Sequence, residues 1–113
     1  MNISYLLHIL LGVLFFCYGL CCGQVSVIHF NSEWNADNNF DITILKDCEK
    51  KDVVICHNEE LQEKHNINAV PTVIVFNGDS EVIRFEANIM MQIEATKKDI
   101  QEEIDKIILA KFE

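Results

Sequence analysis

The sequence predicts an α/β domain with the element order β-α-β-α-β-β-α, and three observations indicate this order. Short β-branched runs at residues 25–30 and 53–55 are typical of buried strands. Two further runs, at residues 72–76 and 81–85, are separated by the residues NGDS, which are a strong hairpin signal. Apolar residues with helical spacing near the C-terminus predict a final amphipathic helix.

A polar cluster follows the first predicted strand and indicates the start of the first helix. Asp37 or Asn38 could cap this helix. Phe40, Ile44 and Cys48 fall four residues apart, which places them on one face. The sequence therefore predicts a short amphipathic helix between the first two strands.

Two further helices are predicted in the second half of the chain. Residues 59–65 read as a helix in which Asn58 is the N-cap. Asn66 closes it, because asparagine tolerates the left-handed conformation that ends many helices. The last helix is expected to bury one apolar face, made by Ile100, Ile104, Ile107, Ile108 and Phe112.

Charge divides the chain into two parts. The first 32 residues contain no Asp, Glu, Lys or Arg, so the whole net charge of −9 lies in the remainder. An acidic body without a basic run argues against a surface for nucleic acid or anionic membranes. We therefore expect no nucleic-acid partner, and the acidity helps to keep a small domain soluble.

Residues 1–23 form an apolar leader, and residues 24–113 form the predicted domain. Cys21 and Gly23 are small residues in the −3 and −1 positions for cleavage before Gln24, which predicts a signal peptide and a place in the secretory pathway, in the ER lumen or outside the cell. The leader has no Lys or Arg before its apolar stretch, which is long enough to span a bilayer if uncut. A membrane anchor through residues 5–23 and a divergent start in a cytosolic protein therefore stay open.

Without the leader, Cys48 and Cys56 are the remaining cysteines. They flank the strand predicted at residues 52–55, and a strand of this length holds its ends beyond the reach of a disulfide. We therefore expect two free thiols. Cys56 and His57 together with His65 lack the spacing and the fourth ligand of a tetrahedral metal site, so we expect no metal and no other cofactor.

Two segments resemble the halves of a thioredoxin-fold active site. They are VIHFNSEW at residues 27–34 and VPTVIVF at residues 70–76. Within that superfamily, KHNINAVPTVIVF at residues 64–76 is most similar to the thioredoxin-like domain of multidomain monothiol glutaredoxins of the PICOT type. The resemblance covers about residues 25–100 and implies a minimal thioredoxin-like core with a cis-proline loop. The family's first strand and helix, and its glutaredoxin domains with their iron–sulfur ligand, have no counterpart here.

The resemblance also shows what this chain lacks. Where the family pattern has Trp-Cys-x-x-Cys, the sequence reads WNADN, with Asn35 and Asn38 in the cysteine positions. An amide cannot supply the thiolate that thiol–disulfide exchange needs. We therefore expect no catalytic residue at the motif and no thioredoxin-type enzyme activity.

A peptide-binding groove is the site that the resemblance implies. Pro71 would be cis, and the backbone of Val70 would pair with an extended partner segment. Trp34 would lie on the rim, and Asn35 and Asn38 could donate hydrogen bonds to the peptide. A purely architectural turn at Pro71 and a Trp34 ring packed on the first helix are the alternatives.

His29 occupies the place where active thioredoxins have a buried carboxylate that moves protons. With no cysteine to deprotonate, we expect a core histidine whose ring is satisfied by hydrogen bonds. The sequence thus favours a monomeric, redox-inactive module that binds a protein or peptide. The alternatives are a thiol–disulfide oxidoreductase for cell redox homeostasis that uses Cys48 or Cys56, and a decayed copy that does not fold cooperatively.

Overall fold

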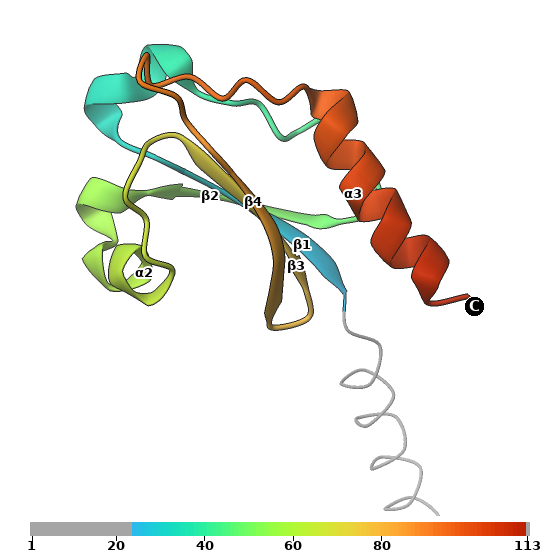
Figure 1. Ribbon diagram of the computed structural model, residues 1–113. Coiled ribbons are helices and arrows are strands. Elements are labelled where there is room, and N and C mark those ends of the chain that lie inside the picture. Colours follow the sequence, from blue (N-terminus) through green and yellow to red (C-terminus); the bar gives the residue numbers. More distant parts are fainter. Residues whose placement is uncertain (1–23, 113) are drawn as a thin grey trace, which may run out of the picture.

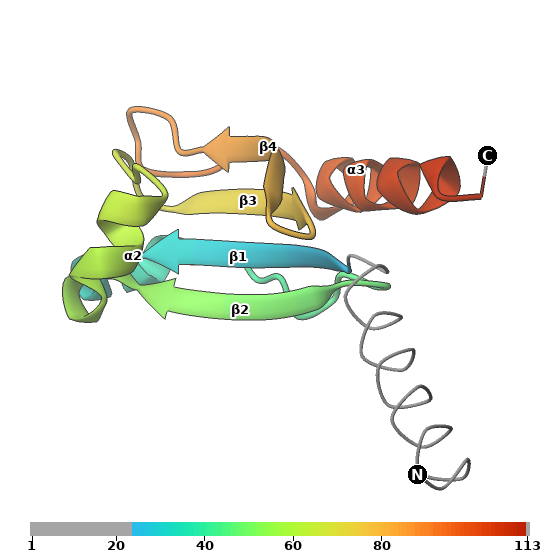
Figure 2. The ribbon, with the colours of Figure 1, turned by 90° about the horizontal axis from the view of Figure 1, so that it is seen from below.

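The computed structural model describes residues 24–112, which form a four-stranded sheet with helices on both faces (Figures 1 and 2). The predicted leader, with its signal-peptide and anchor alternatives, lies outside the described residues. Among the helices that are described, none is long and apolar enough to cross a bilayer.

The sheet has the strand order β2-β1-β3-β4 (Figure 2). Its strands are β1 (Val25–Asn31), β2 (Glu49–Val54), β3 (Thr72–Asn77) and β4 (Ser80–Glu86). β1 pairs in parallel with β2 and antiparallel with β3, and β3 forms an antiparallel hairpin with β4. The four strands and the hairpin confirm the predicted α/β class, and Gly78 supplies the positive φ of 62° at the turn.

β3 is a central strand that is buried on both faces. Val73 and Val75 point into one apolar cluster, and Ile74 and Phe76 point into a second cluster on the other side of the sheet. This alternation follows from the two-residue period of a strand. A continuous apolar run such as TVIVF is what a strand covered on both faces requires.

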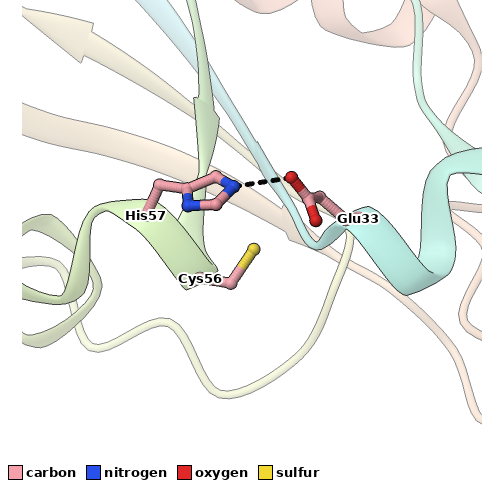
Figure 3. A group of neighbouring side chains, drawn as sticks. All are labelled: Glu33, Cys56 and His57. Carbon is pink, nitrogen blue, oxygen red and sulfur yellow. Dashed lines mark hydrogen bonds and ion pairs between the residues drawn. The ribbon is translucent and has the colours of Figure 1, made fainter.

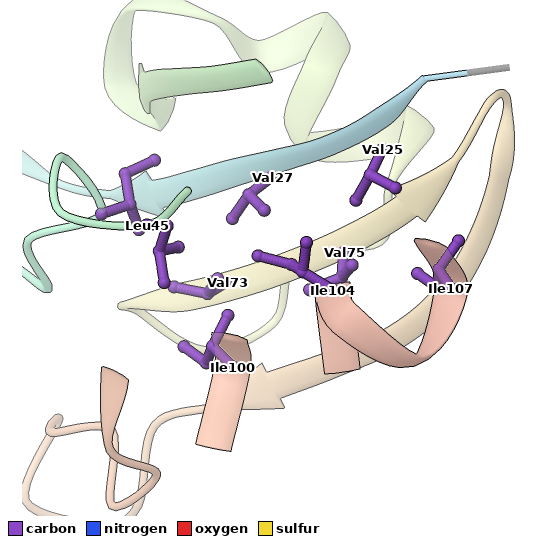
Figure 4. Close-up of a cluster of buried hydrophobic side chains, with 9 residues drawn as sticks. Val25, Val27, Leu45, Val73, Val75, Ile100, Ile104 and Ile107 are labelled. Atoms are coloured by element: carbon purple, nitrogen blue, oxygen red, sulfur yellow. The ribbon is translucent and has the colours of Figure 1, made fainter. Parts of the chain in front are cut away.

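The first cluster lies between the sheet and α3 (Lys97–Ala110). Figure 4 shows Ile100, Ile104 and Ile107 pointing from α3 toward the valines of β1 and β3. The helix begins with a capping box, in which the Thr96 hydroxyl accepts the Asp99 N–H at 3.1 Å. The prediction was wrong for Phe112, which is 84% exposed because the helix ends at Ala110.

The opposite face carries α2 (Glu59–Lys64) and the loop that leads into β3 (Figure 1). Leu61 and Ile67 pack there against the second cluster. Asn66 has a φ of 51°, which confirms the left-handed residue predicted at the end of this helix. Asn58 is at the N-cap position, but its side-chain amide donates to the Val54 carbonyl at 2.9 Å instead of capping.

The prediction of an amphipathic helix after β1 was wrong. A 3₁₀ helix, η1 (Glu33–Asn38), takes up the polar cluster, and residues 39–48 form turns without a helix. Asp41 Oδ1 accepts the N–H of Thr43 at 2.9 Å and its hydroxyl at 2.6 Å, a local turn that competes with helix formation. Ile44 is consequently 56% exposed, while Leu45 turns inward.

β2 is an edge strand, and it is longer toward its N-terminus than the sequence predicts. The side chains of its first four residues, EKKD, are exposed. Charged side chains on an edge strand oppose pairing with another chain, so this composition protects the open edge. Ile55, predicted as strand, begins the short 3₁₀ helix η2 (Ile55–His57) instead.

Candidate functional site

Three strand ends bring the predicted site residues to one edge of the sheet. β1 and β2 are parallel, with Asn31 opposite Val54, so the segments that follow them leave side by side. β3 runs antiparallel to β1, with Thr72 opposite Phe30, so the cis-proline loop enters at the same edge. η1 with the WNADN segment, η2 and the cis-proline loop therefore meet there.

Asn35 is buried beneath the surface of this edge, with only 5% of the residue exposed. Its side-chain amide donates to the carbonyl oxygen of Val70 at 3.2 Å and to that of Met91 at 3.4 Å. It also donates to Asn31 Oδ1 at 3.2 Å. The residue at the first cysteine position thus ties η1 to the cis-proline loop and to the loop after β4.

Asn38, at the second cysteine position, continues this network of amides. Its Nδ2 donates to Asn35 Oδ1 at 2.8 Å, and its Oδ1 accepts from Gln92 Nε2 at 3.2 Å. Asn31 donates to the Asn35 backbone carbonyl at 3.0 Å and to Asn39 Oδ1. Asn35 and Asn38 are therefore occupied within the protein, and Asn35 acts by positioning the loops around it.

The Val70–Pro71 peptide bond is cis, and both residues are buried. The Pro71 carbonyl accepts the Ala87 N–H at 3.0 Å, and the Thr72 hydroxyl donates to the Ala69 carbonyl at 2.7 Å. Among the described residues, no hydrogen bond uses the Val70 N–H. These bonds hold the loop in place, and the Val70 N–H is among its backbone donors that have no acceptor within residues 24–112.

A groove of about 460 Å³ lies beside this loop. Its lining residues are mostly apolar, and they come from η1, η2, α2 and the loops before β3 and after β4: Trp34, Ile55, Gln62, Ile67, Asn68, Ala69, Val70, Asn88, Ile89 and Met91. Trp34 is 68% exposed and Ile89 is 98% exposed. Two large apolar side chains therefore stand in solvent at the groove.

The loop after β4 is the part of the groove that sequence reasoning missed. Asn88 Oδ1 accepts the backbone N–H groups of Met90 at 2.8 Å and of Gln92 at 3.2 Å, which holds the loop in a tight turn. This turn presents Ile89 and Met90 to solvent. The apolar run IMM at residues 89–91, after the predicted end of the last strand, is a signal in the sequence, since a turn is normally polar.

His29 is a satisfied core residue, as predicted. It is 4% exposed, its Nδ1 lies 2.9 Å from Asp52 Oδ1, and its Nε2 accepts the Phe40 N–H at 3.2 Å. Burial lowers the pKa of His29 below 6.5, although Asp52 opposes this shift. Because both ring nitrogens are engaged, the pair does not offer a free general base.

The two cysteines are free thiols in different surroundings. Cys48 is half-buried against the α3 cluster, and burial raises the pKa of its thiol. Cys56 is exposed on η2, next to the groove residue Ile55. A buried thiol with a raised pKa is a poor nucleophile, so Cys48 is unsuited to thiol chemistry.

Three side chains that could bind a metal lie close together, but they are not the set that the sequence suggested. Cys56 and His57 lie beside Glu33, and their ligand atoms are all within 4.8 Å of one another (Figure 3). His65 is elsewhere, with its ring centroid 5.5 Å from that of Phe30 and 5.4 Å from that of Phe76. The sequence could not indicate Glu33, because 23 residues separate it from Cys56.

Solved structures with this arrangement of strands and helices include thioredoxins. Fasciola hepatica thioredoxin is 22% identical with a TM-score of 0.55, over 74% of this chain and 81% of that chain. Schistosoma mansoni thioredoxin is 21% identical with a TM-score of 0.55, over 84% and 87%. Malaria parasite thioredoxin-2, a component of that parasite's protein secretion machinery, is 18% identical with a TM-score of 0.57, over 74% and 84%. No protein-family model and no curated protein sequence matches this chain.

The chain therefore has a thioredoxin-like fold, as the sequence predicted. At these identities the likeness is one of fold, and the functions of the thioredoxins do not transfer with it. The closer resemblance to PICOT-type glutaredoxins stays a prediction. In this chain, a network of amide side chains occupies the cysteine positions of the motif, and an apolar groove lies beside it.

Proposed function

We propose that this protein is a redox-inactive thioredoxin-fold module that binds an extended segment of a protein partner in the groove beside the cis-proline loop. The observation that carries the proposal is the groove itself. Exposed apolar side chains line it together with Val70, whose N–H makes no hydrogen bond among residues 24–112.

The Val70 backbone supports binding of an extended peptide. The Val70 N–H makes no hydrogen bond to residues 24–112, so it is available to an acceptor from outside the chain. An extended peptide satisfies such a donor through its own carbonyl, in the manner of strand addition. The Val70 carbonyl already accepts from Asn35, so the N–H is the group through which we expect pairing.

The side chains of the groove support an apolar or aromatic residue in the bound segment. Trp34, Ile89 and Met91 are exposed apolar residues of the lining, and binding would bury them. Aromatic rings in partly enclosed positions are common anchors of interfaces, and methionine adapts to partners of different shape. The groove thus combines a backbone donor with apolar anchors, which is the pattern of peptide recognition.

The motif positions support the proposal that the protein is redox-inactive. Thiol–disulfide exchange begins with attack by a thiolate, and both positions here carry amides that are hydrogen-bonded within the protein. The alternative, an oxidoreductase that acts through another cysteine, has Cys56 as its candidate because it is the exposed one of the two cysteines within residues 24–112. Reduction of a model disulfide by the full chain, abolished by Cys56→Ser and kept by Cys48→Ser, would favour that alternative.

Selection of peptides from a random library on the immobilised full chain tests the binding proposal. We expect selected peptides to lose about tenfold or more in affinity with Trp34→Ala and with Ile89→Ser, since each substitution removes an anchor. Phe112→Ala and Val82→Ser are matched controls, because these side chains are also exposed but do not line the groove. Peptides that bind all four variants equally, or that are lost only with the controls, would contradict the proposal.

A further inference from the structure

Glu33, Cys56 and His57 come together because two parallel strands end side by side. Asn31 and Val54 are paired at the ends of β1 and β2. Glu33 follows β1 by two residues, in the first turn of η1, and Cys56 and His57 follow β2 on η2. The carboxyl ends of parallel strands are where open α/β sheets commonly place ligand-binding residues. The position is therefore set by the sheet.

The backbones that carry these residues are held in place. The Asn35 N–H donates to the Ser32 carbonyl at 3.1 Å, which closes the start of η1. The Asn58 N–H donates to the Ile55 carbonyl at 3.0 Å, and the Asn58 side chain anchors η2 to Val54. With the backbone fixed, the three side chains need only rotate to bind one metal ion together.

The three side chains point toward one space in front of the sheet edge. Figure 3 shows the Cys56 sulfur directed toward the gap between the Glu33 carboxylate and the His57 ring. His57 Nε2 lies 2.6 Å from Glu33 Oε1, and all three ligand atoms lie within 4.8 Å of one another. Zinc bonds of 2.0–2.3 Å in a tetrahedral site separate neighbouring ligand atoms by roughly 3.3–3.6 Å. Small rotations of exposed side chains bring the three atoms to that spacing.

The donor set matches a borderline-soft divalent ion. One thiolate, one imidazole and one carboxylate are the three ligand types of protein zinc sites, whereas Mg²⁺ and Ca²⁺ prefer oxygen ligands alone. When Cys56 and Glu33 are both anionic, their two negative charges balance the two positive charges of the ion. In an otherwise acidic chain with a net charge of −9, a divalent cation is also attracted from a distance.

We propose that Glu33, Cys56 and His57 form a binding site for one Zn²⁺ ion, with water in the fourth position. Binding forms a Zn–S bond at Cys56 and releases the thiol proton to solvent, while neutral His57 coordinates through Nε2 and Glu33 through one carboxylate oxygen. The contact between Glu33 and His57 is replaced by two bonds to the ion. The site is separate from the peptide groove and does not depend on the proposed function.

Titration of the full chain with Co²⁺, followed by displacement with Zn²⁺, tests this site. Thiolate coordination to Co²⁺ gives a charge-transfer band in the near ultraviolet. We expect this band at a stoichiometry of one ion per chain, and we expect Zn²⁺ to remove it. Cys56→Ser should abolish the band, and His57→Gln and Glu33→Gln should each weaken Zn²⁺ binding by about tenfold or more.

Two matched controls make the test specific. Cys48→Ser removes the other described thiol, and Glu60→Gln removes an exposed carboxylate from the neighbouring α2; both should bind Zn²⁺ as the parent chain does. All three ligands are exposed, so the circular dichroism of each variant should match that of the parent chain. The absence of a cobalt band, or a band that persists with Cys56→Ser, would contradict the proposed site.

Discussion

Asn35 stands where the thioredoxin pattern has its first cysteine, and it is buried. The polar atoms of a buried asparagine amide require hydrogen-bond partners within the protein. Asn35 finds acceptors on the cis-proline loop and on the loop after β4, and Asn38 donates to its oxygen. The Asn35 side chain is therefore a structural link between the segments that form the groove.

Asn35→Ala should destabilise the domain. It leaves the Asn38 amide and the Val70 carbonyl without a buried partner, which costs about 1–3 kcal/mol in the free energy of unfolding. Urea unfolding of the full chain measures this change. Asp37→Ala, an exposed position in the same 3₁₀ helix, should alter stability by no more than about 0.5 kcal/mol. Equal stability of the two variants would contradict the structural role of Asn35.

His29 makes the stability of the domain depend on pH. Burial lowers its pKa in the folded state, so the unfolded chain binds a proton at a higher pH than the folded chain does. The contribution of His29 to the free energy of unfolding is therefore fully present above its ordinary pKa of 6.5 and is lost as the pH falls through the folded-state value. His65, whose pKa is lowered mainly by burial, acts in the same direction.

His29→Gln should flatten this dependence. We expect the free energy of unfolding to fall more steeply below pH 6.5 in the parent chain than in the variant, in which His65 is the described histidine that still has a lowered pKa. Urea unfolding at a series of pH values measures the two slopes. Identical slopes would mean that His29 titrates alike in the folded and unfolded states.

At the scale of elements, α3 is the helix that covers one face of the sheet. Its inward positions are three to four residues apart, and its capping box fixes where it starts. The segment at residues 39–48 adds Ile42 and Leu45 to the same cluster without forming a helix. Most of the packing of this face thus depends on one element.

Ile104→Ala should destabilise the domain by about 2–5 kcal/mol, because Ile104 is fully buried and the substitution leaves a cavity. Leu109→Ala is the matched control on the same helix, at an exposed position, and should change stability by about 0.5 kcal/mol or less. Thermal unfolding of the two variants gives the comparison. A similar loss for both would mean that α3 does not pack through the face described.

The elements that could be predicted from sequence are those with strong local signals. The apolar run of β3, the NGDS hairpin and the spacing of the α3 isoleucines each determine one structure. The prediction of the first helix was wrong because the turn that Asp41 forms with Thr43 competes with the helix that the apolar spacing indicates. The Glu33 cluster could not be predicted, because it depends on the pairing of β1 with β2, which only the fold reveals.

At the scale of the whole molecule, the groove is made by four segments that are far apart in sequence. η1, η2 with the adjoining α2, the cis-proline loop and the loop after β4 each contribute lining residues. The sheet brings their ends to one edge, and the Asn35 network joins three of these segments. The acidic surface outside the groove favours partners whose flanking residues are basic or neutral.

The most direct test of the account is the hydrogen exchange of the Val70 backbone amide, measured by NMR on the full chain with and without a selected peptide. Among the described residues this N–H makes no hydrogen bond, and we predict that a carbonyl group of the bound peptide accepts from it. Exchange at Val70 should therefore slow on binding, with shifts in the Trp34 and Ile89 signals. A peptide that binds tightly without slowing exchange at Val70 would contradict recognition through the cis-proline groove.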